Sequence, residues 1–436
     1  MEVIPLTSPD PSSLKSGEPI VGWQLGRIRP TPSHVPDGWE LLRLTTVARL
    51  ESGHTPSRGK LAYWRGDIPW ISLHDSAAID GPEILYTAQT ISALGLANSS
   101  ARLLPKGTVI FSRTATVGKA TVMGREMATS QDFANYVCGD RVHNQFLMYL
   151  FRFLAPEWNR LMAGSTHNTV YMPVFWELQV LLPPMDEQRA IAAALSDVDA
   201  LIASLDRLIA KKRDLKQAAM QQLLTGQTRL PGFGGKWEDT RIDRLGATYG
   251  GLAGKTKADF REGTAKYIPF MNILANVVLD PQWIESVRVG PSERQNRVQM
   301  GDLFFNGSSE TPEEVGMCAV LLHPTENVFL NSFCFGFRLS EREKANGLFL
   351  AYYFRSSEGR KLIYSLAQGA TRYNLSKSNL LKLLFPLPMP SEQAAIATVL
   401  SDMDAEIAAL EKRRDKTRLL KQGMMQELLT GRTRLV

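Results

Sequence analysis

The chain has 436 residues, which is enough for two or three domains that each bury a core. Hydrophobic residues make up 44% of it and charged residues 22%, a composition that is typical of globular proteins and excludes disordered and fibrous classes. A formal net charge of +6 permits a nucleic-acid partner without requiring one.

The sequence pattern does not suggest a membrane or secreted protein. The most apolar run, residues 146–155, is too short to span a bilayer and contains Arg152. The N-terminus lacks the basic start and apolar core of a secretory signal, so we expect a cytoplasmic protein. The cysteines Cys138, Cys318 and Cys334 form no CxxC pair, which favours reduced thiols over a disulfide framework or a zinc site.

Along the chain, residues 1–38 are rich in Pro, Ser and Gly and show no hydrophobic period. They predict a flexible lead-in. From Trp39 the pattern changes to short apolar runs separated by turns, with a helical pattern over residues 145–162. This pattern predicts a mixed α/β globular domain over residues 39–185.

A long helix is predicted over residues 186–230. Its apolar positions are spaced alternately by four and three residues, which is the heptad seam of a coiled coil. Asp186 can cap the first turn, no proline interrupts, and Gly226 stands where a helix would end. The seam consists of Ile191, Leu195, Val198, Ile202, Leu205 and Ile209.

The second half of the chain repeats the first. A second α/β domain is predicted over residues 231–390 and a second helix over residues 391–436. Without gaps, residues 187–230 and 392–435 share 27 of 44 residues. The predicted fold class is therefore a mixed α+β protein with an internal pseudo-twofold repeat: two α/β domains joined by two long helices. The second helical seam consists of Ile396, Leu400, Met403, Ile407 and Leu410.

The two helices are much more alike than the two domains. Surfaces that stay alike within one molecule suggest two copies of one partner, whereas surfaces that differ suggest different ligands. Each apolar seam needs a cover, and the simplest cover is the other helix in an antiparallel coiled coil, with a domain at each end. About 40 residues give a helix of about 60 Å, a length that suits duplex DNA touched at two places. A coiled-coil adaptor whose domains bind proteins is the alternative.

Four pairs of segments carry a family resemblance: PDGWE (36–40) with GKWED (235–239), GSTHNTVYMP (164–173) with GATRYNLSKS (369–378), LLPPMDEQRAI (181–191) with PLPMPSEQAAI (386–396), and LLTG at the end of each helix. Over residues 36–436 the chain resembles the specificity subunit of a type I restriction-modification system. The lead-in is longer than this resemblance leads us to expect.

The resemblance implies two target recognition domains, each reading one half of a split, asymmetric sequence in double-stranded DNA. It implies an antiparallel spacer of helices that docks two copies of a methyltransferase subunit, and restriction/motor subunits recruited to the assembly. S-adenosylmethionine, ATP and Mg would then belong to the partner subunits, and this chain would need no cofactor.

No catalytic motif is found. The stretch GGLAGKT (250–256) is not a phosphate-binding loop, because Gly250 and Gly254 are separated by three residues instead of four and Tyr249 stands where the first glycine belongs. HExxH, GxSxG and the Asn/Asp-Pro-Pro-aromatic motif of amino-methyltransferases are also missing, and the six histidines form no cluster with Asp or Cys. We therefore predict a non-catalytic chain without a metal site; an NTPase is a third hypothesis that rests on GGLAGKT alone.

DNA contacts are expected from polar and basic side chains in loops, since Arg, Asn and Gln read base edges and Lys and Arg bind phosphates. The basic runs 211–216 and 412–421 lie on the helices, and we interpret them as a solvated face or a partner contact. Charge reversal at Lys211 and Lys212 is accordingly predicted to weaken methyltransferase docking more than it alters the sequence read. An orphan DNA-binding regulator without a methyltransferase stays open as an alternative. The candidate DNA-binding residues are Arg58, Lys60, Ser72, His74, Arg113, Thr114, Lys119, His167 and Asn168 in the first domain, and Lys255, Lys257, Asn272, Arg294, Asn296, Arg297, Asn306, Ser308, Arg372, Tyr373 and Asn374 in the second.

Overall fold

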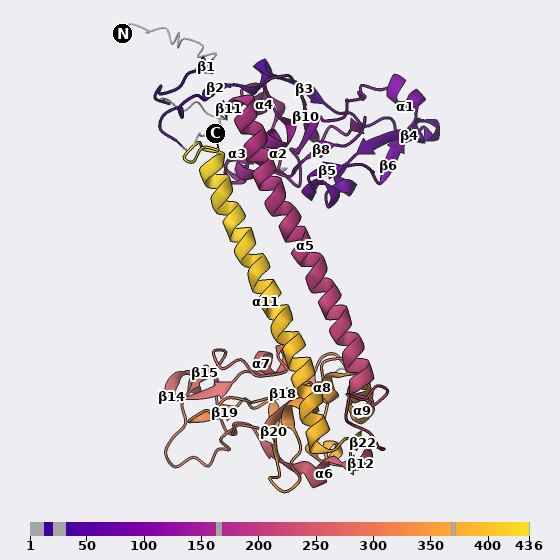
Figure 1. The fold of residues 1–436 in the computed structure, drawn as a ribbon, viewed down its shortest axis with the longest axis vertical. Helices are drawn as coiled ribbons and strands as arrows, with labels where there is room; N and C mark the ends of the chain where they lie inside the picture. The colour runs from indigo at the N-terminus through magenta and orange to yellow at the C-terminus, as the bar shows by residue number, and fades with distance from the viewer. Residues whose placement is uncertain (1–12, 21–31, 163–167, 368, 370–371, 436) are drawn as a thin grey trace. The chain divides into compact units, whose positions relative to one another are not determined.

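The computed structural model describes residues 13–20, 32–162, 168–367, 369 and 372–435 (Figure 1). The chain forms two compact units. Unit 1 consists of the residues up to Asp206 together with those from Arg413 onward, and unit 2 consists of Arg207–Lys412. Among the described residues, no helix has the length and apolar character needed to cross a membrane.

Unit 1 is a mixed α/β domain in which short strands alternate with short helices, as the apolar runs predict. Its elements are β1 (Ser13–Leu14), β2 (Glu40–Arg43), β3 (Ala48–Ser52), β4 (Trp64–Ile71), β5 (Glu83–Ile84), β6 (Gln89–Ile91), α1 (Ala93–Ala97), β7 (Val109–Ser112), β8 (Ala120–Met123), β9 (Ala128–Thr129), β10 (Phe133–Cys138), α2 (Asn144–Phe153), α3 (Ala155–Met162), α4 (Met172–Trp176), β11 (Gln179–Leu182) and the first part of α5 (Met185–Leu223).

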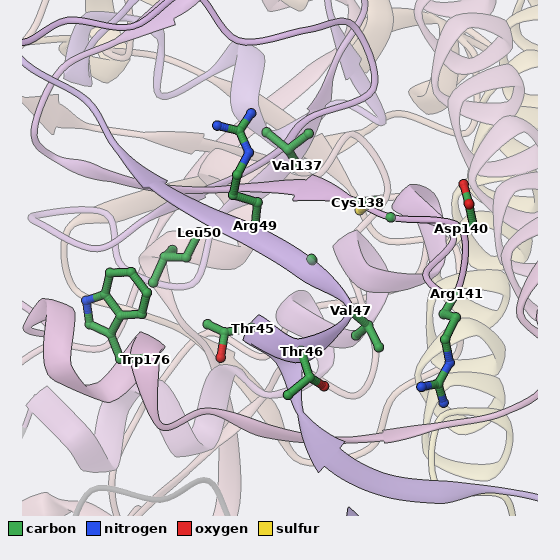
Figure 2. Close-up of a pocket in the computed structure, with 12 residues that line it drawn as sticks. Thr45, Thr46, Val47, Arg49, Leu50, Val137, Cys138, Asp140, Arg141 and Trp176 are labelled. Carbon is green, nitrogen blue, oxygen red and sulfur yellow. The ribbon is translucent and has the colours of Figure 1, made fainter. Parts of the chain in front are cut away.

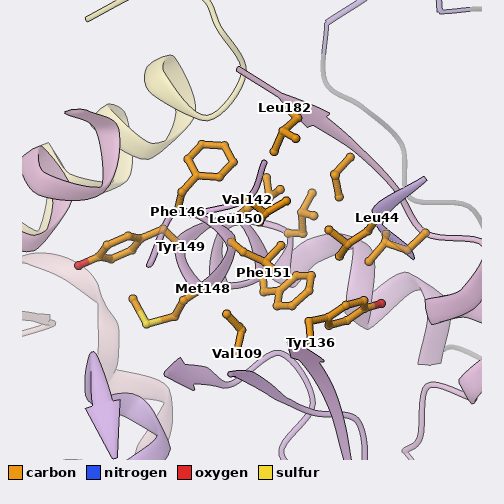
Figure 3. Close-up of a cluster of buried hydrophobic side chains, with 14 of the residues drawn as sticks. Leu44, Val109, Tyr136, Val142, Phe146, Met148, Tyr149, Leu150, Phe151 and Leu182 are labelled. Carbon is orange, nitrogen blue, oxygen red and sulfur yellow. The ribbon is translucent and has the colours of Figure 1, made fainter. Parts of the chain in front are cut away.

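The main sheet of unit 1 has the strand order β3-β10-β7-β8-β5. Its central strands are apolar on both faces, because α2 covers one face and a smaller cluster around Ile110 and Phe133 covers the other. Figure 3 shows the α2 side, where Phe146, Tyr149 and Phe151 gather around the helix above the sheet. A second sheet, β6-β4-β9, forms a separate lobe with its own small core.

The lead-in contributes a strand to unit 1. Ser13–Leu14 (β1) pairs antiparallel with β2, which also pairs with β11, so β2 lies at the centre of a three-stranded sheet. Val35 is 2% exposed and packs in the core of unit 1, and its backbone exchanges hydrogen bonds with Gly17 and Glu18. The described part of the lead-in is therefore attached to the domain by backbone pairing and burial.

Unit 2 has the same kind of architecture, although its described residues include no strand equivalent to β1. Its elements are β12 (Glu238–Arg241), α6 (Ile242–Leu245), β13 (Gly246–Gly250), β14 (Phe260–Ile268), α7 (Phe270–Ala275), β15 (Glu285–Val287), β16 (Leu303–Asn306), β17 (Ser308–Ser309), β18 (Cys318–Val320), β19 (Val328–Leu330), β20 (Cys334–Leu339), α8 (Gly347–Arg355), α9 (Ser357–Leu366), β21 (Tyr373–Asn374), α10 (Lys377–Leu380), β22 (Leu384–Leu387) and the first part of α11 (Pro390–Leu428).

The sheets of unit 2 repeat those of unit 1. The order β13-β20-β16-β18 corresponds to β3-β10-β7-β8, and β15-β14-β19 corresponds to β6-β4-β9. In each unit a half-buried arginine ties a helix to the backbone of the neighbouring strand and loop. The guanidinium of Arg152 in α2 donates to the carbonyls of Ala120 and Gly81, and that of Arg355 in α8 donates to those of Cys318 and Asn276. Carbonyl oxygens pointing at one guanidinium satisfy its donors without a carboxylate, which is how a partly desolvated cation is tolerated here.

Both long helices have 39 residues, and each one contributes its first part to one unit and its second part to the other. Within unit 1, Asp199 pairs with Lys421 and Asp206 pairs with Arg418, so the two helix segments run antiparallel. Within unit 2, Lys212 pairs with Glu406, and Arg229, just after α5, pairs with Glu392, so the two segments run antiparallel there as well.

The seam residues divide between two environments. Ile191 and Leu195 are fully buried in the core of unit 1, and Ile396 and Leu400 in that of unit 2, so the start of each seam packs into its own globular domain. Farther along, Leu205, Ile209 and Ile407 are buried, while Val198, Ile202, Met403 and Leu410 are half-buried.

Candidate nucleic-acid interface

In unit 1, a loop cluster forms where β7 ends. Arg113 follows β7, and its carbonyl accepts from Val170 N at 2.9 Å, while Ala115 N donates to Asn168 O at 3.2 Å. Thr114 bridges to Thr169 in the same place. Three predicted candidates, Arg113, Thr114 and Asn168, are thus brought together from segments more than fifty residues apart.

Unit 2 forms the equivalent cluster after β16. Ser308 and Ser309 pair antiparallel with Asn374 and Tyr373, and Leu375 N donates to Gly307 O at 2.9 Å. Arg372 and Asn374 are exposed there, beside the half-buried Ser308 and Tyr373. The segments 168–170 and 373–375 therefore occupy equivalent places in the two domains, although their sequences differ. Residues 164–167 and 370–371 of the Gly-led turns, with His167 among them, lie outside the described residues.

The two clusters differ in what they offer a ligand. The guanidinium of Arg113 is half engaged: its Nε donates to Gln131 O at 2.9 Å, and burial lowers its pKa while the nearby Asp132 opposes that shift. Unit 2 offers an exposed Arg372 and the amide of Asn374 instead. Because base edges are distinguished by the donors and acceptors placed against them, equivalent clusters with different residues suit different base pairs.

Several predicted candidates have structural roles and face inward. Ser72 is 3% exposed and caps a short helical turn with Asp75, and Asn272 is fully buried and donates to the carbonyls of Asp280 and Trp283. Their polar atoms are used by the protein itself. Asn306 is also fully buried, and its amide nitrogen donates to Glu314 O, although its Oδ1 has no partner among the described residues. The ammonium of the half-buried Lys119 binds Asp80 and Ser76 O.

The remaining candidates are exposed. Arg58 lies over the rings of Trp64 and Trp70, with its guanidinium carbon 5.0 Å and 5.8 Å from their centroids. Lys60 donates to Tyr63 Oη at 3.1 Å, and the amide of Asn296 donates to Gly250 O at 3.0 Å. His74, Lys257, Arg294 and Arg297 are exposed as well.

The stretch Gly250–Thr256 forms a closed turn. The Lys255 side chain is 4% exposed, and its ammonium binds Glu293 and the carbonyl of Arg288. A three-residue helical turn follows at Lys257–Asp259, and then β14. A phosphate-binding loop leads into a helix whose free amides face the phosphates, and the lysine points at the ligand. Neither condition is met by this turn.

The basic runs on the helices are largely paired. Lys212 and Arg213 bind Glu406 and Glu411 in unit 2, and Arg414 and Arg418 both reach Asp206 in unit 1. These cations pair with acids of the other helix, so pairing between the helices uses much of the basic charge that the sequence concentrates there.

A surface pocket of about 650 Å³ lies along the free edge of β3 in unit 1 (Figure 2). Its two arginines are engaged, Arg49 with Glu51 and Arg141 with Glu40. Burial raises the pKa of the Cys138 thiol to about 12, so the thiol stays protonated and is no nucleophile. Within the described part of the chain, no group of three or more His, Cys, Asp or Glu side chains could hold a metal ion.

Each domain is fixed to the helices by a tyrosine and an aspartate that the sequence did not single out, together with the last lysine of each basic run. Tyr149 Oη donates to Asp199 at 2.9 Å, and Lys421 Nζ binds the same carboxylate at 2.7 Å. Unit 2 repeats this arrangement: Tyr352 Oη donates to Asp404 at 2.7 Å, and Lys216 binds that carboxylate too. Asp199 and Asp404 are 205 positions apart, and so are Lys216 and Lys421, which is the offset of the repeat. The occurrence of the same residue at both positions was the sequence signal that could have identified this contact.

The comparisons with known proteins agree with this architecture. A family model described as "Type I restriction modification DNA specificity domain" matches residues 36–211 and again residues 247–419. The MjaVIII specificity subunit of a type I restriction enzyme from Methanocaldococcus jannaschii is 23% identical over 92% of this chain and 94% of its own length. The MjaIX specificity subunit of the same organism is 29% identical, over 38% of this chain and 39% of its own length.

Solved structures share the fold. The HsdS subunit from Thermoanaerobacter tengcongensis has a TM-score of 0.53 at 20% identity, covering 92% of this chain and 99% of that chain. A chain solved in a study of complex assembly and conformational transition of the type I R-M system has a TM-score of 0.59 at 19% identity, covering 91% and 99%. With two matched segments that together span most of its length, this protein belongs to the family of type I restriction modification DNA specificity domains and carries two copies of that domain.

Proposed function

We propose that this chain is the DNA sequence-specificity subunit of a type I restriction-modification system and reads a split, asymmetric target with its two domains. The observation that carries the proposal is the pair of equivalent loop clusters, one after β7 and one after β16, which offer different side chains at the same place in the fold. Each domain reads one half of the target, and the halves differ because the clusters differ.

The two long helices form an antiparallel coiled coil that docks two copies of one methyltransferase subunit, with restriction and motor subunits joining through them. Exposed apolar side chains at matched positions support this. Leu215 is 47% exposed in unit 2, and Leu420, at the same position of the repeat, is 59% exposed in unit 1. Large exposed leucines that recur at the repeat offset suit a partner that binds twice.

In this proposal the chain is non-catalytic and acts in the cytoplasm. Methyl transfer, ATP hydrolysis and cleavage take place on partner subunits, which hold S-adenosylmethionine, ATP and Mg. The closed turn around Lys255 supports this, since its ammonium is bound by Glu293 instead of being free for a nucleotide.

The test is a map of methylated bases in host DNA with this reading frame intact and disrupted. We expect methylation to disappear from one split, asymmetric motif. Exchanging residues 39–183 for another recognition domain should then change one half of that motif only. An unchanged map would contradict the proposal and favour a coiled-coil adaptor or an orphan DNA-binding regulator, either of which should purify without a methyltransferase.

A further inference from the structure

Each unit has an arginine in a backbone conformation that residues other than glycine rarely adopt. Arg65 has φ 59° and Arg261 has φ 78°. Each is the second residue of a corresponding strand, β4 in unit 1 and β14 in unit 2. In this left-handed region the β-carbon crowds the backbone, so arginine is disfavoured there, and Asn or Gly is the usual choice.

Both arginines lie on a β-bulge. In unit 1, Trp64 and Ile68 both pair with Ile91, which leaves the residues between them out of the ladder. In unit 2, Phe260 and Ala265 both pair with Val287. A bulge of this kind bends a strand and redirects a side chain, and bulges are frequent next to functional sites.

An aromatic pair lies beside each bulge, on the same strand as the arginine. The rings of Trp64 and Trp70 meet edge to face with centroids 5.0 Å apart, and those of Phe260 and Tyr267 do so at 5.1 Å. Trp64 Nε1 also donates to Ser57 O at 3.1 Å. These contacts join the small cores beside β4 and β14, so each arginine is presented from a fixed base.

A glycine on the same bulge lets two neighbouring segments of the backbone approach closely. A β-carbon on Gly66 would lie 2.3 Å from Ser92 Cα, and one on Gly263 would lie 2.5 Å from Val287 O. The bulge therefore has the same components in both units: an aromatic residue, a strained arginine and a glycine that lies against the neighbouring backbone segment. The segments themselves, WRGDI and FREGTA, are otherwise different.

Both arginine side chains are exposed. Among the described residues, neither guanidinium forms a hydrogen bond or an ion pair within the protein. The positive charge of Arg261 acts to lower the pKa of Tyr267, against the larger raising effect of burial. Beside Arg65 is a surface pocket of about 440 Å³, which Arg58 and Gln89 also line. The Oε1 atom of Gln89 is buried and has no hydrogen-bond partner in the described structure.

We infer that Arg65 and Arg261 read base edges, one in each half of the target. The inference rests on the proposed function. A phosphate can be bound by any flexible lysine or arginine on the surface, so strain and fixed presentation would gain nothing there. A base edge requires a guanidinium at a defined position and angle, and guanine offers it two acceptors, O6 and N7. The strained, aromatic-backed bulge in both otherwise divergent domains fits that requirement.

The experiment compares methylation motifs in cells that express this chain with its methyltransferase partner. Arg65→Gly and Arg261→Gly remove the guanidinium at a position where glycine adopts the backbone without strain, so the fold should be kept. Arg65→Lys and Arg261→Lys keep the charge but lose the two-pronged geometry. Arg125→Lys and Arg342→Lys are matched controls, since both arginines are exposed and neither has a positive φ.

We expect each Arg65 variant to relax one position in one half of the motif by about tenfold or more, and each Arg261 variant to do so in the other half. The controls should leave the motif unchanged. Uniformly weaker binding to all sequences, with a shallower salt dependence, would identify phosphate contacts and overturn the inference. An unchanged motif would overturn it too. If the unmodified chain directs no split motif, the proposed function itself fails, and this outcome is distinct from the other two.

Discussion

Glu187 and Arg434 are 247 positions apart in the chain and form a two-pronged ion pair, with Nε–Oε1 at 2.6 Å and Nη2–Oε2 at 2.7 Å. Glu187 stands in the first turn of α5 and is fully buried. Unit 2 repeats the pair as Glu392 with Arg229. The Glu-Gln at each helix start and the Thr-Arg-Leu after each helix end are therefore two sides of one contact, which explains why the sequence repeats both.

Removing Glu187 should destabilise unit 1 strongly. In Glu187→Ala, the guanidinium of Arg434 and the indole N–H of Trp39, which also donates to Glu187, lose their buried acceptor. We expect the free energy of unfolding of unit 1 to fall by about 3 kcal/mol, measured by urea denaturation. Asp186→Ala is the matched control, because the Asp186 side chain is 88% exposed. Equal effects of the two substitutions would contradict this role for Glu187.

The exposed leucines of the helices should decide how many methyltransferase copies bind. Leu215→Asp in unit 2 and Leu420→Asp in unit 1 each place a charge where an apolar partner surface is proposed. We expect each single variant to retain one copy and the double variant none, measured as the mass of the purified complex. Leu61→Asp is the control, since Leu61 is 85% exposed but lies outside the two long helices α5 and α11. Two bound copies in the double variant would exclude this docking surface.

Charge reversal in the run 211–216 should separate docking from helix pairing. Lys211 is exposed, whereas Lys212 binds Glu406 at 2.7 Å. Lys211→Glu should weaken methyltransferase docking without changing thermal stability, as judged by co-purification and by the melting temperature. Lys212→Glu should also lower the melting temperature, and adding Glu406→Lys should restore it. A changed DNA motif in a fully assembled Lys211→Glu complex would overturn the assignment of this run to docking.

The turn at Gly250–Asp259 should open in acid. Hydrogen bonds from the backbone and side chain of Thr256 lower the pKa of Asp259 from 3.8 to about 2, and the Lys255 ammonium is the main cause that lowers the pKa of Glu293 from 4.5 to about 2. A carboxylate whose pKa is depressed by folding contributes stability above its unfolded pKa, and that contribution is lost as the pH falls through the folded value. The window for this turn is therefore about pH 4.5 to 2.

Amide exchange of residues 254–259, corrected for the intrinsic rates, checks this expectation. Protection should be constant above about pH 5 and should decline toward about pH 2. In Asp259→Asn the Thr256 amide keeps a side-chain acceptor that does not ionise, so the part of the decline due to Asp259 should disappear. Protection that is independent of pH in the unmodified protein would show that these carboxylates do not hold the turn.

The lead-in strand should stabilise unit 1. Its partner β2 buries both Leu41 and Leu42, whereas the equivalent strand β12 has the polar Asp239 and Thr240 and is mostly exposed. Deleting residues 1–20 removes β1 and should lower the free energy of unfolding of unit 1 by about 2 kcal/mol, because apolar area on β2 becomes exposed. Urea denaturation and binding of an apolar dye would measure this. An unchanged free energy of unfolding would contradict a stabilising role for β1.

The repeats and helix positions were predictable because they depend on periodicity. The predicted helix over 186–230 corresponds to α5, which begins at Met185 and ends at Leu223, and Gly226 then adopts φ 71° just beyond it. What periodicity could not reveal is which element covers which part of a seam. Ile191 and Ile396 have the same spacing as the residues that follow them, yet both pack into the globular cores.

The candidate site was harder to predict, since a polar residue in a loop can serve a ligand or the loop itself. Ser72 and Asn272 belong to similar segments of the two domains and looked like base-reading residues, but they cap and brace turns. That choice depends on neighbouring backbone groups that a single sequence does not display. Conversely, Arg65 and Arg261 share only an aromatic residue before them and a nearby glycine, and their backbone strain becomes visible only in three dimensions.

The way the helices divide between the units has a consequence for synthesis of the protein. Unit 2 is one continuous stretch, Arg207–Lys412, while unit 1 also needs the residues from Arg413 onward. Leu428 and Leu429 are buried in the core of unit 1. On the ribosome, unit 1 must therefore wait for completion until all of unit 2 has been made, although its own strands emerge first. A chain whose translation stops before this point leaves that core open, and it would present chaperones and proteases with apolar surface that a finished chain hides.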